Sequence, residues 1–135
     1  MKLITYYICP AESLRKDVIL KEVARGLISL KLTAEGELRY VTTMKEVIRL
    51  LKEGADGKIV LVNDGGTTFL APILSKLAGV VCITGALGSH LAIVTREFEI
   101  PALMGTKIEN PEDLDRKHVM IKPEEGTTGV LFVTE

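Results

Sequence analysis

The sequence predicts an α/β fold in which parallel strands are joined by crossover helices and accompanied by antiparallel hairpin strands. Two continuous apolar runs, 58–62 and 80–83, are typical of strands that are buried on both faces of a parallel sheet. Each run is followed by a glycine-containing loop and a segment with helical features, and a third apolar run follows at 100–104. Strand, loop and helix repeated in this order predict βαβ units, which form parallel sheets.

The first half of the chain predicts antiparallel strands and two helices. Alternating or apolar runs bounded by proline and glycine indicate strands, and apolar residues at roughly helical spacing indicate a helix. We expect strands at 3–9, 27–32 and 37–41, a turn at 34–36 and a helix at 13–25. Thr43 and Glu46 match the capping-box pattern, which predicts a second helix that ends at Gly54.

The second half predicts helices after each parallel strand and a closing hairpin. Thr67 or Thr68 can cap a helix that runs through Pro72 to Leu77, with the proline in its first turn. Ser89 should begin the next helix, which ends at about Phe98. Two final strands, at 118–121 and 130–133, are separated by a turn at 123–126.

Composition excludes several classes of protein. The chain has 135 residues, which predicts one domain over 1–135, and a net charge of -1. Aromatic residues make up 4%, so we expect no nucleic-acid partner. The apolar runs are too short to cross a bilayer and no signal peptide is evident, so we expect no membrane partner and a cytoplasmic location. Cys9 and Cys82 should be buried, reduced thiols, and no metal site is expected.

His90 is the residue whose position most clearly indicates a chemical role. It should fall in the first turn of a helix, after a loop that contains Gly85 and Gly88. The first N–H groups of a helix have no internal partner, and the helix dipole adds partial positive charge there, which favours a bound phosphoryl group. The same field disfavours imidazolium, and only the neutral ring has a lone pair for attack on phosphorus.

Simpler interpretations remain open for these residues. A single histidine near a helix start is usually a surface or capping residue, and Ser89 is first of all a plausible N-cap. Thr67 and Thr68, in the loop after the neighbouring strand, can serve as helix caps in the same way. His118 follows a lysine at a strand start, and we interpret it as structural.

A longer motif around His90 favours the chemical interpretation. Residues 83–106 read ITGALGSHLAIVTREFEIPALMGT, and this segment resembles the signature of the mobile, swivelling phosphohistidine domain of phosphoenolpyruvate-utilising enzymes. That family includes pyruvate phosphate dikinase, phosphoenolpyruvate synthase and enzyme I of the sugar phosphotransferase system. The resemblance covers 58–135 well and 1–57 only loosely. The positions that match are Gly85, Ser89, His90, Ala92, Ile93, Arg96, Ile100, Pro101, Ala102 and Gly105. The chain departs from the usual pattern at Thr84, Ala86, Gly88 and Leu91.

The resemblance implies a swivelling β/β/α fold and a set of residue roles. His90 would be the catalytic phosphoacceptor. Its phosphoryl oxygens would be bound by the loop and by the two threonines of the neighbouring loop: Gly85, Ala86, Leu87, Gly88, Ser89, Thr67 and Thr68. Arg96 lies nearly two helical turns past His90, so we expect it to support docking or structure. Pro101 and Gly105 should shape the backbone.

The resemblance also implies that the chain works with partners. It predicts a phosphocarrier that is the phosphotransfer subunit of a split dikinase- or synthase-type phosphotransferase and is inactive alone. The partners would be an ATP-grasp-type nucleotide-binding subunit and an acceptor subunit. ATP or phosphoenolpyruvate, with Mg²⁺, would be bound by the partner, and this chain would bind no cofactor. The alternatives are a non-catalytic anion-binding or regulatory module with the same fold, or a purely architectural subunit.

Overall fold

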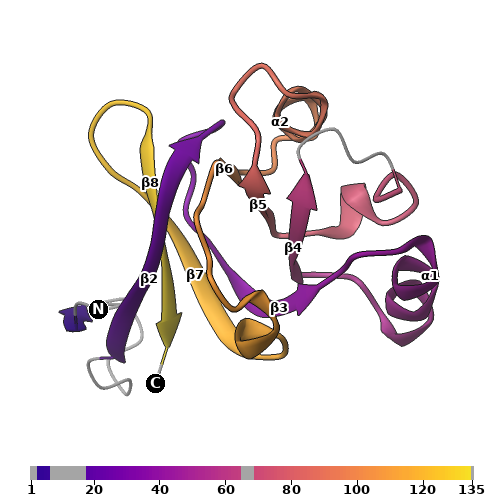
Figure 1. The fold of residues 1–135 in the computed structure, drawn as a ribbon, viewed down its shortest axis with the longest axis horizontal. Helices are drawn as coiled ribbons and strands as arrows, with labels where there is room; N and C mark the ends of the chain where they lie inside the picture. Colours follow the sequence, from indigo (N-terminus) through magenta and orange to yellow (C-terminus); the bar gives the residue numbers. More distant parts are fainter. Residues whose placement is uncertain (1–2, 7–17, 65–68, 135) are drawn as a thin grey trace.

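A computed structural model describes residues 3–6, 18–64 and 69–134 of the chain (Figure 1). In this part the strands form a mixed sheet in the order β1-β2-β6-β5-β4-β3-β7-β8. The elements are β1 (Leu3–Tyr6), β2 (Val18–Ile28), β3 (Ala34–Tyr40), α1 (Met44–Glu53), β4 (Ile59–Asp64), η1 (Leu74–Lys76), β5 (Gly79–Thr84), α2 (His90–Glu97), β6 (Ala102–Met104), η2 (Pro111–Leu114), β7 (His118–Pro123) and β8 (Thr128–Thr134).

Four adjacent strands form the parallel part of the sheet. β3 pairs with β4, β4 with β5 and β5 with β6, all in parallel register. β7 then pairs antiparallel with β3 and forms a hairpin with β8. The predicted combination of parallel strands, crossover segments and an antiparallel hairpin is therefore confirmed.

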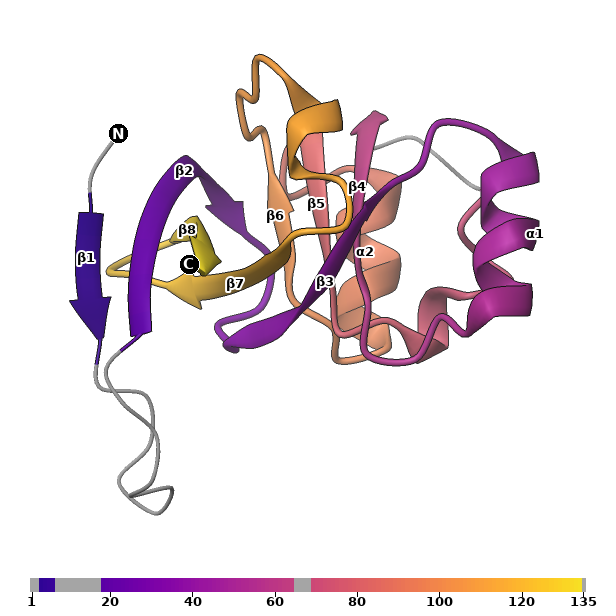
Figure 2. The same cartoon turned by 90° about the horizontal axis from the view of Figure 1, so that it is seen from below.

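The sheet closes on itself through β2. This long strand pairs antiparallel with β8 from Leu20 to Leu27 and with β6 at Leu27 and Ile28. Gly26 makes the closure possible, because a Cβ atom at this position would collide with the backbone carbonyl oxygen of Met104. Figure 2 shows β2 and β8 next to each other, with β1 on the outer side of β2.

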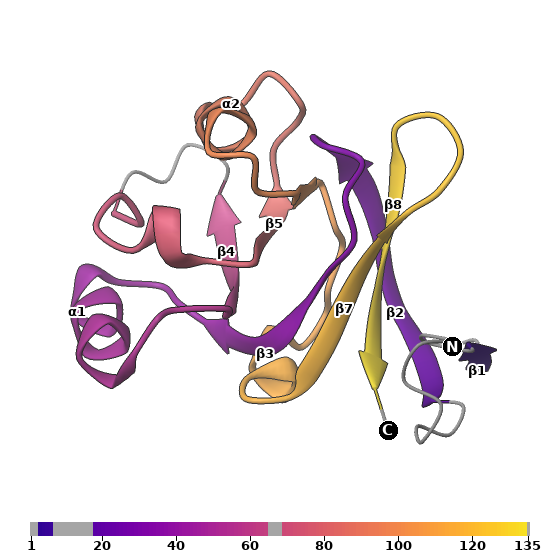
Figure 3. The same cartoon turned by 180° about the vertical axis from the view of Figure 1, so that it is seen from behind.

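Alternate residues of β4 and β5 face two different cores, as expected for strands that are buried on both faces. Val60 and Val62 belong to the cluster that includes buried residues of α1, η1 and α2. Ile59 and Leu61 belong to a second cluster, which includes residues of β7, β8 and η2. The helices therefore cover one face of the parallel strands and the antiparallel strands cover the other, which gives a β/β/α arrangement (Figure 3).

Both predicted helices with clear capping residues are confirmed. α1 begins after Thr43, whose hydroxyl accepts a hydrogen bond from the Glu46 N–H at 3.4 Å, and its C-cap is Gly54, as expected. α2 begins after Ser89 and ends before Phe98. The predicted strands at 80–83, 118–121 and 130–133 also appear within β5, β7 and β8, and the strand predicted at 58–62 appears as β4, which begins one residue later.

Four local predictions were wrong. Of the strand expected at 27–32, only Leu27 and Ile28 are strand, at the end of β2. Most of the segment predicted as a helix at 13–25 is strand: β2 begins at Val18, and residues 13–17 lie outside the described residues. The turn expected at 34–36 is part of β3. The helix expected through Pro72 to Leu77 consists of turns and the short 3-10 helix η1, because its recorded hydrogen bonds join residues three apart, such as Ile73 N–H to Leu70 O.

Candidate functional site

The site lies where β4 and β5 end side by side, below the start of α2 in the view of Figure 1. Asp64 and Thr84 are register partners at these two strand ends. The Thr84 hydroxyl donates a hydrogen bond of 2.7 Å to the Asn63 carbonyl oxygen, which ties the ends together. The ends of the two parallel neighbours β4 and β5 therefore lie side by side. The loop that follows β5, 85–89, is described completely.

Ser89 and Ala86 close this loop with two hydrogen bonds. The Ala86 N–H donates to the Ser89 hydroxyl oxygen at 2.8 Å, and the Ser89 N–H donates to the Ala86 carbonyl oxygen at 2.9 Å. Ser89 occupies the N-cap position of α2, but its hydroxyl oxygen makes no capping hydrogen bond to the helix. Since the hydroxyl accepts from Ala86, its own proton remains for donation to another group.

His90 is the first residue of α2, and its side chain is exposed. The first N–H of the helix with a backbone acceptor is that of Ile93, which donates to the Ser89 carbonyl oxygen at 3.1 Å. Within the described part of the chain, the N–H groups of His90, Leu91 and Ala92 have no such acceptor. An accessible imidazole therefore lies beside three backbone donors and the positive end of the helix dipole.

Packing of the rest of α2 fixes the orientation of His90. Leu91 and Ala92, the next two residues, are buried in the core cluster under the helix. Thr95 is also buried, and its hydroxyl contacts the carbonyl oxygens of Leu91 and Ala92 at 2.8 and 3.1 Å. Because these residues define the inner face, His90 is directed to the surface at the helix start.

Arg96 supports the loop and not the helix start. Its guanidinium donates a hydrogen bond of 3.1 Å to the Leu87 carbonyl oxygen. This contact connects the last turn of α2 to the loop that precedes it. The structural role expected for Arg96 therefore has a specific partner.

Pro101 and Gly105 hold the backbone on either side of β6. The Pro101 carbonyl oxygen accepts from the Val80 N–H at 3.0 Å, at the start of β5. Gly105 has a φ of 68°, and a Cβ atom built on it would lie 3.2 Å from the Gly85 carbonyl oxygen. Gly85 itself has a φ of 128°. The two glycines thus bring the end of β6 close to the first residue of the loop.

Two residues near the strand ends were missed by the sequence analysis. Thr106 is fully buried, and both its N–H and its hydroxyl donate to the Cys82 carbonyl oxygen, at 3.0 and 2.7 Å. It fixes the chain after β6 against β5. Asp64 places a carboxylate at the end of β4. Its position just beyond the continuous buried run 59–62 was the signal that could have identified it.

The remaining candidates are placed as follows. Thr67 and Thr68 lie outside the described residues. His118 starts β7, and its Nε2 lies 3.5 Å from a Glu35 carboxylate oxygen. Cys82 is fully buried, and burial raises the pKa of its thiol to about 11. Among the described residues no group of three or more histidine, cysteine, aspartate or glutamate side chains could hold a metal ion.

Fold and site together define a swivelling-type β/β/α domain with an exposed histidine at a helix start. The model of the family described as "PEP-utilising enzyme, mobile domain" matches residues 54–126, which is more than half of the chain. The chain therefore belongs to the family of mobile domains of phosphoenolpyruvate-utilising enzymes. The family prediction made from the motif around His90 is confirmed.

Individual relatives agree with this assignment. The chain is 31% identical over 91% of its length to a phosphoenolpyruvate synthase of Aquifex aeolicus. It is 28% identical over 85% of its length to a probable phosphoenolpyruvate synthase of Archaeoglobus fulgidus. It spans only 13% and 15% of these two proteins.

A solved structure with little sequence similarity shares the fold. It is an MccF-like protein from Bacillus anthracis, with a TM-score of 0.51 and 11% identity over 87% of this chain and 51% of that one. At this identity the likeness concerns the fold alone. In the part of the chain that the structure describes, no helix is both long and apolar enough to span a bilayer.

Proposed function

We propose that this chain is a phosphocarrier that accepts a phosphoryl group on His90 and passes it to an acceptor. One observation carries the proposal: the exposed imidazole of His90 lies at the first residue of α2, beside helix N–H groups that have no backbone acceptor. Oriented backbone donors at a helix start are a favourable site for phosphoryl oxygens. Membership of the mobile-domain family supports the same function.

The chemistry requires one bond to form as another breaks. The lone pair of a neutral imidazole nitrogen attacks phosphorus, the N–P bond forms, and the bond from phosphorus to the oxygen of the leaving group breaks. The leaving oxygen takes the electron pair, and the ring releases the proton of its other nitrogen to solvent or to the leaving group. Transfer to the acceptor reverses these events with the acceptor's nucleophile.

The loop is proposed to hold the phosphoryl oxygens together with the helix. The Ser89 hydroxyl retains a proton to donate, since it accepts from the Ala86 N–H. The N–H groups of Ala86 and Ser89 are already bonded within the loop, so the proposed backbone donors are those of Gly85, Leu87 and Gly88 and of the first turn of α2. Donors fixed before the reaction stabilise developing charge without reorganisation.

The donor and acceptor sites are proposed to lie on partners. The chain matches only 13% of the length of the Aquifex synthase. We propose that an ATP-grasp-type partner supplies the phosphoryl group from ATP or phosphoenolpyruvate with Mg²⁺. A second partner would accept it, as in a split dikinase- or synthase-type phosphotransferase.

The test is covalent labelling with a matched pair of histidine variants. The chain is incubated with radiolabelled ATP or phosphoenolpyruvate and cell lysate, and separately with phosphoramidate, a small donor that needs no partner. We expect an adduct that is lost in acid and kept in base, as expected for phosphohistidine. His90→Ala should abolish it, and His118→Ala, which changes the other histidine of the chain, should retain it.

The outcomes separate the proposal from its alternative. Label that persists in His90→Ala would overturn the assignment of His90 as phosphoacceptor. If neither donor labels the chain, but inorganic phosphate shifts the amide resonances of the first turn of α2, the result supports the non-catalytic anion-binding module. In that case the carrier function is rejected.

A further inference from the structure

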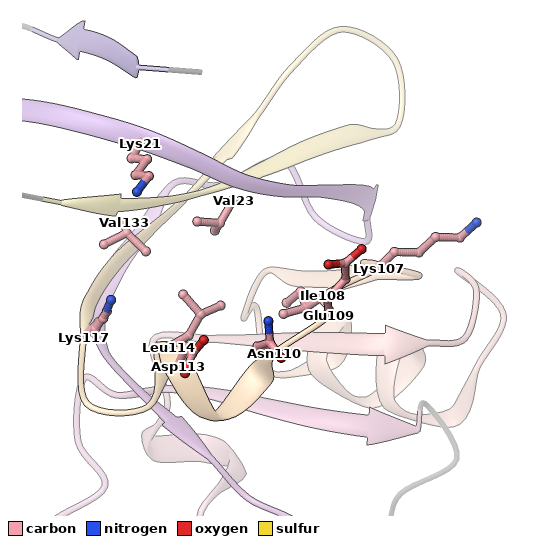
Figure 4. A pocket seen from close by; sticks show the side chains of 10 residues that line it. All are labelled: Lys21, Val23, Lys107, Ile108, Glu109, Asn110, Asp113, Leu114, Lys117 and Val133. Atoms are coloured by element: carbon pink, nitrogen blue, oxygen red, sulfur yellow. The ribbon is translucent and has the colours of Figure 1, made fainter. Parts of the chain in front are cut away.

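A second cleft lies on the face of the parallel strands that α2 does not cover (Figure 4). It has a volume of about 490 Å³ and is bounded by β2, β8, η2 and the segment that leads into η2. The end of the cleft at η2 lies toward the starts of the parallel strands. The chain after η2 pairs with the start of the parallel strands, since the Arg116 N–H donates to the Leu38 carbonyl oxygen and Leu38 is the register partner of Ile59. His90, by contrast, follows the ends of these strands.

The floor of the cleft is apolar. Val133 and Leu114 are buried, and each is only 7% exposed. Val23 and Ile108 are half-buried and pack against the same core cluster, which lies inside the closed sheet. The other lining residues are charged or polar: Lys21, Lys107, Glu109, Asn110, Asp113 and Lys117. The volume of the cleft lies within the range of small-molecule sites.

Two lysines face each other across one end of the cleft. In Figure 4 the amino groups of Lys21 and Lys117 are directed toward the space beside Val133. Within the described residues neither amino group forms an ion pair, whereas the amino group of Lys58, just before β4, forms an ion pair with Glu37 at 2.8 Å. Two lysines that form no ion pair with any described residue, beside an apolar floor, favour a ligand that brings an oxyanion.

The other end of the cleft has the opposite character. Glu109 contributes a carboxylate and Asn110 an amide toward that end, and the Asp113 carboxylate lies beside Leu114, between Asn110 and the lysines. Neither carboxylate is in an ion pair with a described residue. A second anionic group on a ligand would be repelled at this end, whereas a neutral or cationic group would be tolerated. The two ends therefore restrict both the charge and the orientation of the ligand.

We propose that this cleft is a binding site for a small organic monoanion with an apolar body. The oxyanion, a carboxylate or a phosphate, would lie between Lys21 and Lys117. The apolar body would pack on Val23, Leu114 and Val133, and the far end of the ligand would carry no negative charge. The site is separate from the phosphocarrier site and does not depend on phosphorylation of His90.

Four related probes test the charge pattern by titration calorimetry and amide resonance shifts. We expect 3-phenylpropanoate to bind and to shift resonances of β2 and of residues 107–117. The uncharged 3-phenylpropanamide and the dianion 3-(4-carboxyphenyl)propanoate should each bind at least about tenfold more weakly, because a charge-assisted contact is lost or a repulsion is added. Phenyl phosphate, as the fourth probe, separates a phosphate from a carboxylate preference.

Variants locate the binding. The double variant Lys21→Gln, Lys117→Gln should weaken binding of 3-phenylpropanoate by at least about tenfold. Lys107→Gln should leave it unchanged, since the Lys107 amino group points away from the cleft in Figure 4. Thermal unfolding of each variant reports whether the fold is retained. If the double variant is unstable, binding is measured with Lys21→Arg, which keeps the charge and should bind 3-phenylpropanoate.

Several results would overturn the proposal. The first is equal affinity for 3-phenylpropanamide and 3-phenylpropanoate. The second is a loss of affinity in Lys107→Gln as large as that in the double variant. The third is no binding of either 3-phenylpropanoate or phenyl phosphate at millimolar concentration. His90→Ala should bind 3-phenylpropanoate as the unchanged chain does. Failure of the cleft proposal and failure of the carrier proposal are therefore distinguishable.

Discussion

Replacing Gly105 by alanine tests whether the end of β6 positions the loop before His90. Gly105 has a φ of 68°, a conformation that costs an ordinary L-residue roughly 1–2 kcal/mol. The new Cβ atom would also lie 3.2 Å from the Gly85 carbonyl oxygen, so this backbone atom must move by a few tenths of an ångström. We estimate about 1 kcal/mol more for the movement, as for mild overpacking. The expected total loss of unfolding free energy is therefore about 2–3 kcal/mol.

Gly57→Ala is the matched control for this prediction. Gly57 has a similar φ of 74°, but a Cβ atom there would have no neighbour within 4 Å. Gly57→Ala should therefore lower the unfolding free energy only through its positive φ, by about 1–2 kcal/mol. Urea unfolding of both variants gives the difference, and amide resonances of Ala86 and His90 should shift only in Gly105→Ala. Equal losses of unfolding free energy in the two variants, or unshifted resonances of Ala86 and His90 in Gly105→Ala, would refute the reasoning that Gly105 is in close contact with Gly85.

Three further predictions concern the loop, the buried thiol and the core. Arg96→Met removes the hydrogen bond to the Leu87 carbonyl oxygen and should lower phosphoryl labelling of His90. Because this contact is exposed, its loss should lower the unfolding free energy, measured with urea, by no more than about 1 kcal/mol. Labelling equal to that of the unchanged chain would contradict a positioning role for Arg96. Cys82 should resist iodoacetamide in the folded chain and react when unfolded, as followed by peptide mass spectrometry. Burial raises its pKa from 9.0 to about 11, so the protonated thiol favours the folded state below pH 9, and this stabilisation is lost as the pH rises through about 11. Leu103→Ala should cost about 2–5 kcal/mol because the side chain is fully buried, whereas Leu32→Ala, at 45% exposure, should cost under about 1 kcal/mol; similar losses would contradict the assigned core.

The predictable parts of the fold are those in which local signals agree. In α1, the capping residues and the buried positions Val47 and Leu50 indicate the same helix. In β4 and β5, continuous apolar runs reflect burial on both faces. These features depend only on residues that are close together in the chain, so they can be predicted from one sequence.

The errors arose where one pattern fits two structures. In β2, the buried residues Ala24 and Ile28 are four apart, a spacing that suits one face of a helix and one face of a strand. Leu20, a further four residues back, packs in a different core cluster, because the register shifts between Glu22 and Ala24. Gly36 was predicted in a turn, but it lies in β3, where a Cβ atom would collide with the Gly57 carbonyl oxygen. Its function is a close approach between distant segments, which local sequence does not contain.

In the candidate site, the position of His90 was predicted from the sequence, whereas the contacts between separate elements were not. The position of His90 at the start of α2 followed from the loop and the motif, and the structure agrees with it. The contact of Arg96 with Leu87 and the role of Thr106 between β5 and β6 were not predicted. Both depend on how the loop folds back over its own helix and on which strands are neighbours.

Closure of the sheet by β2 has a consequence for the proposed function, in which the domain moves between partners. An open sheet would leave the backbone groups of β6 and β8 exposed as templates on which another chain could add a strand. Here β2 is hydrogen bonded to both of them. In a carrier that is detached from its proposed partners, the backbone groups of β6 and β8 that pair with β2 would not be available for strand addition by another chain. Docking to a partner would then depend on side chains.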